Sequence, residues 1–272
     1  ERTVPRPPPT VERTTLLAAG ALMMHTPQLS PARPTDGYDF TPCFAPVAPR
    51  ISAADLAIGN FETVLAGADR GYTGYPTFNS PDSYAEAAVE AGFDVLTHAN
   101  NHTLDRGPTG LVRTREVLES LGALTTGTAR TAEEAAEILV VDVRGVRVAV
   151  LAYSYGMNGF TAPSDKPWMV NVINEEAMTA DVQRARGLGV DLVVVSIHNG
   201  VEYQRQPSTS QAALEQAMVD AGADVVLGSH PHVIQPMTVV GATRADGSPR
   251  DAFIIHSLGN FISNQRERFR NT

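Results

Sequence analysis

Cysteine is almost absent from this chain, because Cys43 is the only one among 272 residues. A single cysteine excludes an internal disulfide framework and any cysteine-rich zinc site. The surrounding sequence TPCFAP offers no base or helix start that would stabilise a thiolate. We therefore predict that Cys43 packs as a small residue and is not a nucleophile.

A basic surface and a long apolar run are also missing. The net charge is −9 and the pI is near 5.2, which argues against broad capture of nucleic acid or anionic membrane, so we predict no nucleic-acid partner. No apolar stretch is long enough to span a bilayer. The hydrophobic fraction of 43% and mean hydropathy of −0.11 are typical of a soluble globular protein with a proper core.

The two ends of the chain differ in composition from the rest. Residues 1–13 include four prolines among charged and polar residues, a composition typical of an extended linker. Such a linker is expected between a membrane anchor that this chain does not include and an exported domain, and a cytosolic tail would have a similar composition. We predict a single domain over residues 14–272, truncated at its C-terminus.

Apolar runs of strand type alternate with amphipathic, helix-like stretches along most of the chain, which predicts an α/β protein with mixed sheets. The predicted strands lie in the segments 14–23, 54–60, 93–99, 146–155, 190–198, 223–230 and 251–260, and the predicted helices lie in 80–92, 107–122, 175–189 and 208–222. The segment 137–153 predicts a hairpin that turns at Arg144–Gly145. Three long loops rich in proline and glycine are predicted at residues 26–50, 63–80 and 156–172. In a compact domain, loops of this length are often functional.

Groups able to bind metal follow the predicted strands. They are His25, Asn60, Glu62, Asn100, Asn101, His102, His198, Glu202, His230, His232 and Asn260. Because ligands bind at the carboxyl ends of strands in α/β sheets, we expect these residues to converge on one crevice. Imidazole, carboxylate and amide oxygen suit Mn, Zn or Fe, and more than four such ligands indicate two ions about 3.5–4 Å apart.

Each motif also has a purely structural interpretation. His230 and His232 point two rings from one short turn, which favours metal ligation. Asn101 and His102 alone would be a turn or a helix cap, but beside the other groups we favour function. Glu62 alone would be an ordinary loop acid.

The supporting residues carry alternatives as well. Glu202 is predicted to orient His198 as an outer residue of the site. Arg106 would hold an anionic substrate group or form a structural ion pair. His98 and His256 are interpreted as ordinary hydrogen-bonded histidines.

Several segments together resemble the CapA/PgsA family of bacterial capsule or poly-γ-glutamate synthesis proteins, within the metallophosphatase-like superfamily. They are IGNFETVL, GFDVLTHANNHTLDRGPTGLVRT, VVVSIHNGVEYQRQP, AGADVVLGSHPHVIQPM and IIHSLGNFISNQ. They occur in the family's order from about residue 14 to 265, and their combination is specific.

This resemblance implies a four-layer αββα fold with a dinuclear metal centre between the sheets. It implies that Glu62, Asn101, His198, His230 and His232 contact the metals. His102 would then contact the scissile group or protonate the leaving group. The resemblance also implies a protein on the extracellular face of the membrane, held by an N-terminal anchor.

One position departs from the family. The first strand of the family usually ends in Gly-Asp, a few residues before a histidine, and that Asp is a metal ligand. Here Gly20 is followed by Ala21, while the motif through His25 is intact. The acid was either lost naturally or removed by engineering. Because the surrounding motif is intact, we favour removal by engineering. We therefore expect one of the two metal positions to bind its ion more weakly.

The leading functional hypothesis is a metal-dependent hydrolase, phosphoesterase-like, acting on an anionic small molecule or an envelope polymer in capsule or poly-γ-glutamate synthesis. His102 and Arg106 would be its catalytic residues. A related hypothesis is amide hydrolysis or transfer on a γ-glutamyl polymer. The alternative is a non-catalytic, polymer-binding component that works with other membrane proteins of a synthesis and export complex.

Overall fold

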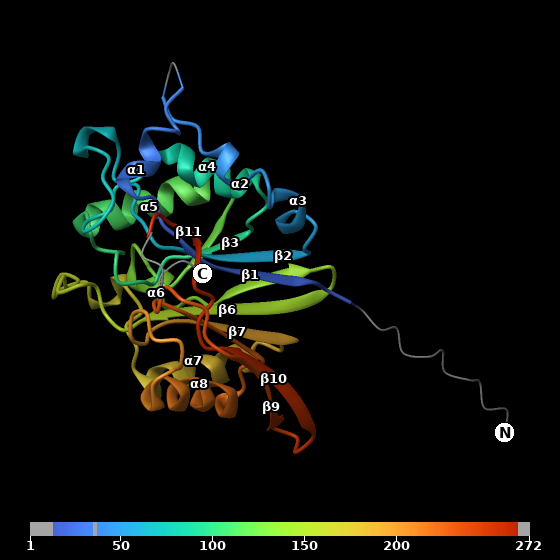
Figure 1. The fold of residues 1–272 in the computed structure, drawn as a ribbon. Helices are drawn as coiled ribbons and strands as arrows, with labels where there is room; N and C mark the ends of the chain where they lie inside the picture. Colours follow the sequence, from blue (N-terminus) through green and yellow to red (C-terminus); the bar gives the residue numbers. More distant parts are fainter. Residues whose placement is uncertain (1–12, 35–36, 266–272) are drawn as a thin grey trace, which may run out of the picture.

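The computed structural model describes residues 13–34 and 37–265. Residues 1–12 of the predicted linker and the C-terminal residues 266–272 lie outside this range. Two sheets pack face to face, and helices cover the outer face of each (Figure 1). The predicted α/β fold and the four-layer αββα order are therefore confirmed, and one of the two sheets is mixed. Within the described ranges, no helix combines the length and the apolar character that crossing a membrane requires.

The first sheet has the strand order β11-β1-β2-β3-β4, and all of its neighbouring strands are parallel. Its strands are β1 (Leu16–Leu22), β2 (Leu56–Phe61), β3 (Val95–Thr97), β4 (Leu124–Thr126) and β11 (Asn260–Ile262). Its outer face is covered by α2 (Thr41–Phe44), α3 (Ala48–Ile51), α4 (Asp82–Glu90) and α5 (Gly107–Ser120). Tyr84 of α4 is fully buried among Phe40, Phe44 and Phe61, which anchors this helical layer.

The second sheet is mixed, in the order β5-β6-β7-β8-β10-β9. Its strands are β5 (Leu139–Val143), β6 (Val146–Ser154), β7 (Leu192–His198), β8 (Val225–Ser229), β9 (Met237–Thr243) and β10 (Pro249–Ile255). Helices α7 (Glu175–Gly187) and α8 (Thr209–Ala221) pack on its outer face through Met178, Val182 and Met218. The predicted hairpin joins β5 to β6, with positive φ at Arg144 and Gly145.

Apolar side chains from both sheets fill the layer between them. Ile58 and Val95 of the first sheet meet Val148, Val194 and Leu227 of the second. The strands of the first sheet are parallel to one another, and so are β6, β7 and β8 of the second. The carboxyl ends of each set therefore share one edge. The polar groups that follow these strands are therefore gathered where the two sheets meet.

The chain crosses between the sheets at residues 256–259, and two glycines allow this crossing. A Cβ at Gly20 would lie 2.0 Å from the carbonyl oxygen of Gly259, and one at Gly228 would lie 1.9 Å from that of His256. No other residue type fits such close backbone contacts. This crossing places Asn260 opposite Ala21.

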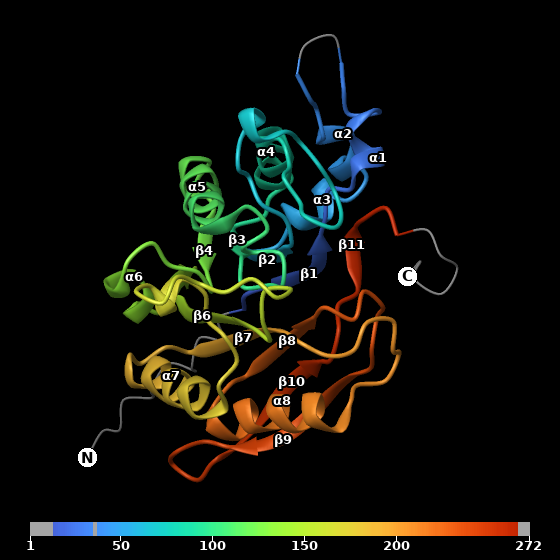
Figure 2. The same cartoon turned by 90° about the vertical axis from the view of Figure 1, so that its left-hand side faces the viewer.

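The predicted loop 26–50 contains three short helices, α1 (Thr26–Leu29), α2 and α3, and α6 (Ala132–Ala136) follows β4 (Figure 2). Single turns, η1 (Ala68–Arg70) and η2 (Pro167–Met169), lie in the other two long loops. Cys43 is exposed on α2, so the prediction that it is packed was wrong, because this four-residue helix buries only Phe44. Burial of part of the thiol and the charge of Asp39 raise its pKa, which keeps it protonated.

Candidate metal centre

Glu62 follows β2 and lies at the centre of the polar cluster. Its side chain is fully buried, and its Oε2 accepts a hydrogen bond from Asn60 Nδ2 at 3.0 Å. Its Oε1 lies 3.7 Å from His198 Nε2 and 3.9 Å from His232 Nε2. Among the residues described, that oxygen has no hydrogen-bond partner. Burial raises the pKa of Glu62 well above its usual range, and a nearby cation would favour the ionised form of this carboxylate.

His198 is the last residue of β7, and Asn101 lies in the turn after β3. The His198 Nε2 is 2.9 Å from Asn101 Oδ1, while its Nδ1 is 3.4 Å from Asn60 Nδ2. Burial, followed by the neighbouring His230, lowers the pKa of His198 well below its usual range. The ring is therefore neutral, which is the state in which imidazole binds a metal.

His230 and His232 occupy a strained turn after β8. Their φ angles are +101° and +58°, conformations that cost non-glycine residues on the order of 1–3 kcal/mol each and that cluster at functional sites. His232 Nδ1 lies 3.0 Å from Asn260 Oδ1. Burial lowers the pKa of His230 to about 3, and its Nδ1 has no hydrogen-bond partner in the described part of the chain.

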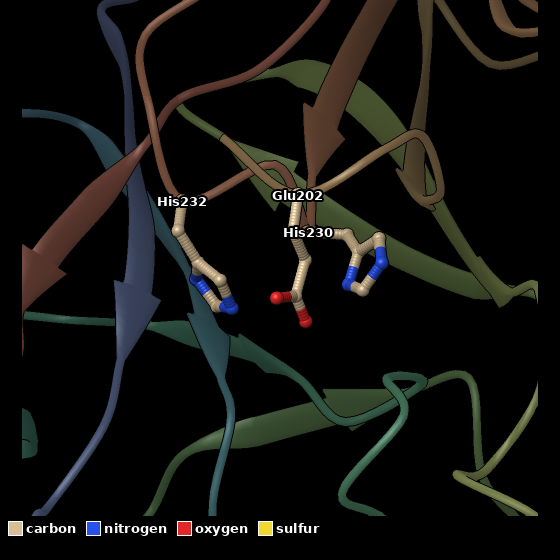
Figure 3. Close-up of side chains that lie close together, drawn as sticks. All are labelled: Glu202, His230 and His232. Carbon is tan, nitrogen blue, oxygen red and sulfur yellow. The ribbon is translucent and has the colours of Figure 1, made fainter. Parts of the chain in front are cut away.

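Glu202 joins these two histidines from the loop after β7, although its side chain is otherwise exposed (Figure 3). One ligand atom from each of Glu202, His230 and His232 lies within 4.8 Å of the others. The Tyr203 N–H donates to the Pro231 carbonyl at 2.8 Å, which ties this loop to the histidine turn. The nitrogens of His198 face Asn60 and Asn101 instead, so Glu202 is placed as a further candidate ligand and does not orient His198.

His102 lies beside this cluster and is paired with a carboxylate. Its Nδ1 is 2.8 Å from Asp105 Oδ2, which also accepts the Phe78 N–H at 2.6 Å. The Phe78 ring packs edge-on against His102 at 4.6 Å. Asp105 was not among the predicted residues, although its spacing of three residues from His102 is a signal for such a pair. The pair fixes the ring so that Nε2 is the nitrogen left for chemistry.

Asn100 and Asn60 brace the turn and the ligands. Asn100 Nδ2 donates to the Phe61 carbonyl at 2.9 Å, and its Oδ1 accepts the His102 N–H at 3.1 Å. Asn60 connects Glu62 to His198, as described above. Asn260 holds His232 in the same way, but it begins β11 of the first sheet and does not simply follow β10.

His25 and Ala21 lie on the side of the site formed by β1. The His25 ring packs edge-on against Phe78 at 5.3 Å, and its Nδ1 accepts the Asn264 N–H at 3.2 Å. Burial, together with smaller effects of His232 and His102, lowers the pKa of His25 to about 4, although a hydrogen bond with the Met23 backbone opposes this shift. Ala21 is buried, and its backbone lies opposite both Asn60 and Asn260.

Arg106 lies at the outer side of His102 and holds the loop before α4. Its guanidinium donates to the carbonyls of Phe78 and Thr77 at 3.2 and 3.1 Å and to the Thr73 hydroxyl. These contacts favour the structural alternative for Arg106, although its partners are carbonyls and a hydroxyl, not a carboxylate. Its effect on the site runs through Phe78, which packs against His102.

The donors fit one or two divalent ions. Glu62 Oε1 lies within 4 Å of both His198 and His232, and the His198 and His230 rings are 5.0 Å apart. Neutral imidazoles, carboxylates and an amide oxygen are the donor types that Mn, Zn and Fe accept. The unpartnered Glu62 Oε1 and His230 Nδ1 are the kind of buried polar atoms that an ion would satisfy.

The bacterial capsule synthesis protein family PGA_cap matches residues 15–265, so the chain belongs to this family. It is 32% identical over 264 residues to the capsule biosynthesis protein CapA of Bacillus anthracis, covering 93% of this chain and 61% of that protein. It is 30% identical over 226 residues to the PGA biosynthesis protein CapA of Bacillus subtilis strain 168, covering 82% and 57%. The resemblance to the CapA/PgsA family is thereby confirmed.

The chain spans about three fifths of the length of these two relatives. Among solved structures, a candidate 5′-nucleotidase from Staphylococcus aureus superposes with a TM-score of 0.50 and 12% identity, covering 92% of this chain and 55% of that one. At such low identity the likeness extends to the fold alone.

Proposed function

We propose that this chain is a metal-dependent hydrolase of phosphoesterase type that acts on an anionic envelope or capsule polymer, or on a precursor of one. The observation that carries the proposal is the His102–Asp105 pair beside the converging donors Glu62, Asn101, His198, His230 and His232. A general acid next to a set of metal donors is an arrangement suited to hydrolysis.

Divalent ions held by these donors would supply Lewis acidity, which activates water and stabilises negative charge on the reacting group. The protein's own contribution is positioning and proton transfer. Asp105 accepts the Nδ1 proton of His102, so the Nε2 side can deliver a proton to the leaving oxygen or nitrogen. Phe78 packs against the same ring and limits its movement.

Amide hydrolysis or transfer on a γ-glutamyl polymer would use the same groups. A leaving nitrogen needs a proton just as a leaving oxygen does, and His102 can supply it. We extend the proposal to this polymer class because the family is one of capsule synthesis proteins and two relatives are named for capsule or PGA biosynthesis. Work on the extracellular face of the membrane, beside other membrane components of capsule synthesis, is part of the same proposal and rests on the family resemblance.

The second candidate is a non-catalytic component that binds the polymer. The observation that favours it is Ala21, a buried alanine at the position where the family usually has an acidic ligand. The overall charge of −9 is unfavourable for an acidic polymer, so binding of this kind needs bound metal or a local basic group.

The two candidates differ in a simple assay. The chain and its Ala21→Asp variant are incubated with Mn²⁺ or Zn²⁺ and a phosphomonoester, a phosphodiester or γ-linked glutamate oligomers. We expect metal-dependent release of product that disappears with EDTA and with His102→Asn. The absence of turnover with every metal, together with metal-independent retention of the polymer, would establish the binding component instead.

A further inference from the structure

Asn158, on the loop after β6, contacts the side chain of Asn101. Asn101 follows β3 of the first sheet and Asn158 follows β6 of the second, and the two residues are 57 positions apart. Asn101 Nδ2 donates to Asn158 Oδ1 at 3.1 Å, while Asn101 Oδ1 faces His198 Nε2 at 2.9 Å. An amide has an acceptor end and a donor end, and only the oxygen can bind a cation. Which end faces the site therefore decides whether Asn101 can be a ligand.

Asn158 is itself held in place. Its backbone is left-handed, with φ +48°, a conformation that asparagine accepts more readily than most residues. The Tyr155 hydroxyl donates to the same Asn158 Oδ1 at 3.3 Å. Two donors thus converge on one oxygen, and this arrangement keeps that oxygen, and not the NH₂ group, directed at Asn101.

Tyr155 also contacts two of the histidines directly. Its ring is nearly parallel to that of His198, with centroids 6.4 Å apart and a 10° angle, and it lies 4.6 Å from the ring of His230. One segment of four residues therefore covers two candidate imidazole ligands and fixes the amide of a third candidate ligand. Sequence patterns gave no signal for this role beyond the long loop that begins at residue 156.

We propose that Asn158 is a positioning residue of the metal centre: it accepts the Asn101 NH₂ group and so presents the Asn101 oxygen to the ion, with Tyr155 holding Asn158 in that orientation. This inference rests on the metal centre of the proposed function. The hydrogen bonds that surround a ligand typically contribute 10–100-fold to metal affinity.

Two substitutions separate the side chain of Asn158 from its backbone. Asn158→Gly keeps the left-handed conformation and removes the acceptor, whereas Asn158→Asp keeps both. We expect Asn158→Gly to weaken Mn²⁺ binding by roughly 10-fold. Asn158→Asp should bind Mn²⁺ at least as tightly as the parent chain. Tyr155→Phe, which removes the second donor, should weaken binding less than Asn158→Gly.

The experiment titrates the full 272-residue chain with Mn²⁺ alone in a calorimeter, with thermal unfolding in EDTA as the check that each variant is folded. A double-mutant cycle with Asn101→Ala, measured as Mn²⁺ affinity, tests whether Asn158 affects binding through Asn101. In the Asn101→Ala background, Asn158→Gly should cause no further loss. If it weakens binding by the same factor in both backgrounds, or leaves the parent affinity unchanged, the inference is overturned.

The same titration distinguishes this failure from that of the proposed function. If neither the parent chain nor Ala21→Asp binds Mn²⁺ or Zn²⁺, the metal centre itself is refuted, and this inference falls with it. If both bind and Asn158→Gly binds equally well, only the positioning role is refuted.

Discussion

We expect the Ala21→Asp substitution to make the stability of this protein depend on bound metal. Ala21 is 1% exposed and packs with Met23 and Phe78, so an aspartate there buries a carboxylate. Asn60, which lies opposite Ala21, already donates to the buried Glu62, so the new charge would lie near another acid. A buried charge without a partner costs roughly 3–5 kcal/mol, and protonation lowers that cost. In EDTA we expect a loss of about 2–3 kcal/mol in the free energy of unfolding.

Mn²⁺ should reverse this loss. An ion that binds only the folded state adds about 2.7 kcal/mol to the free energy of unfolding when the free ion is at one hundred times its dissociation constant. The aspartate is also an anionic oxygen donor of the kind that Mn²⁺ prefers. We therefore expect Ala21→Asp in Mn²⁺ to be at least as stable as the parent chain. Ala21→Asn is the matched control, because it has the same size without the charge and should gain less from Mn²⁺.

The assay is equilibrium unfolding in urea, with EDTA or Mn²⁺, followed by circular dichroism and by the fluorescence of the single tryptophan, Trp168. Equal midpoints for the parent and Ala21→Asp in EDTA would show that the position does not bury a charge. Equal gains of the Asp and Asn variants in Mn²⁺ would show that the aspartate is not a ligand. Either result refutes the reasoning.

Three further predictions concern other parts of the molecule. In the Ala21→Asp background, Asp105→Asn should lower turnover by roughly 10²–10⁴-fold and leave the Mn content unchanged by mass spectrometry. A joint His230→Ala and His232→Ala change should remove most bound Mn, and unchanged metal content would contradict the ligand assignment. Burial lowers the pKa of His98 to about 4, below 6.5 in the unfolded chain, so its stabilising contribution is present above pH 6.5 and lost as the pH falls toward 4. This loss amounts to about 2 kcal/mol between pH 7 and 5, and urea unfolding in EDTA should show a shallower pH dependence for His98→Gln.

Much of the candidate site was predictable because the candidate ligands follow apolar strands. Glu62 comes directly after β2, His198 ends β7, and His230 comes directly after β8. Parallel strands place such residues at one edge whatever the details of packing. For the same reason, the main strands and the helices α4, α5, α7 and α8 were predictable from apolar spacing.

The remaining features depend on contacts that no local pattern encodes. Asn260 was predicted to end the strand at 251–260, yet β10 ends at Ile255 and Asn260 begins β11 in the other sheet. The chain crosses between them with close backbone contacts at Gly20 and Gly228. Strand β9 had no matching prediction, since an exposed edge strand depends on its pairing with β10. Asn158 approaches Asn101 only through the packing of one sheet on the other.

The backbone neighbours of Ala21 explain why the candidate site does not depend on an acidic side chain at position 21 for its shape. Its two backbone neighbours, Asn60 and Asn260, each hold a candidate ligand, Glu62 and His232 respectively. Neither hydrogen bond involves the side chain at position 21. Glu62 and His232 therefore stay oriented when that side chain is an alanine. Glu202 brings a second carboxylate close to His230 and His232. We therefore expect the chain with Ala21 to bind a metal more weakly than Ala21→Asp, because the aspartate would add a charged donor to side chains that are already oriented.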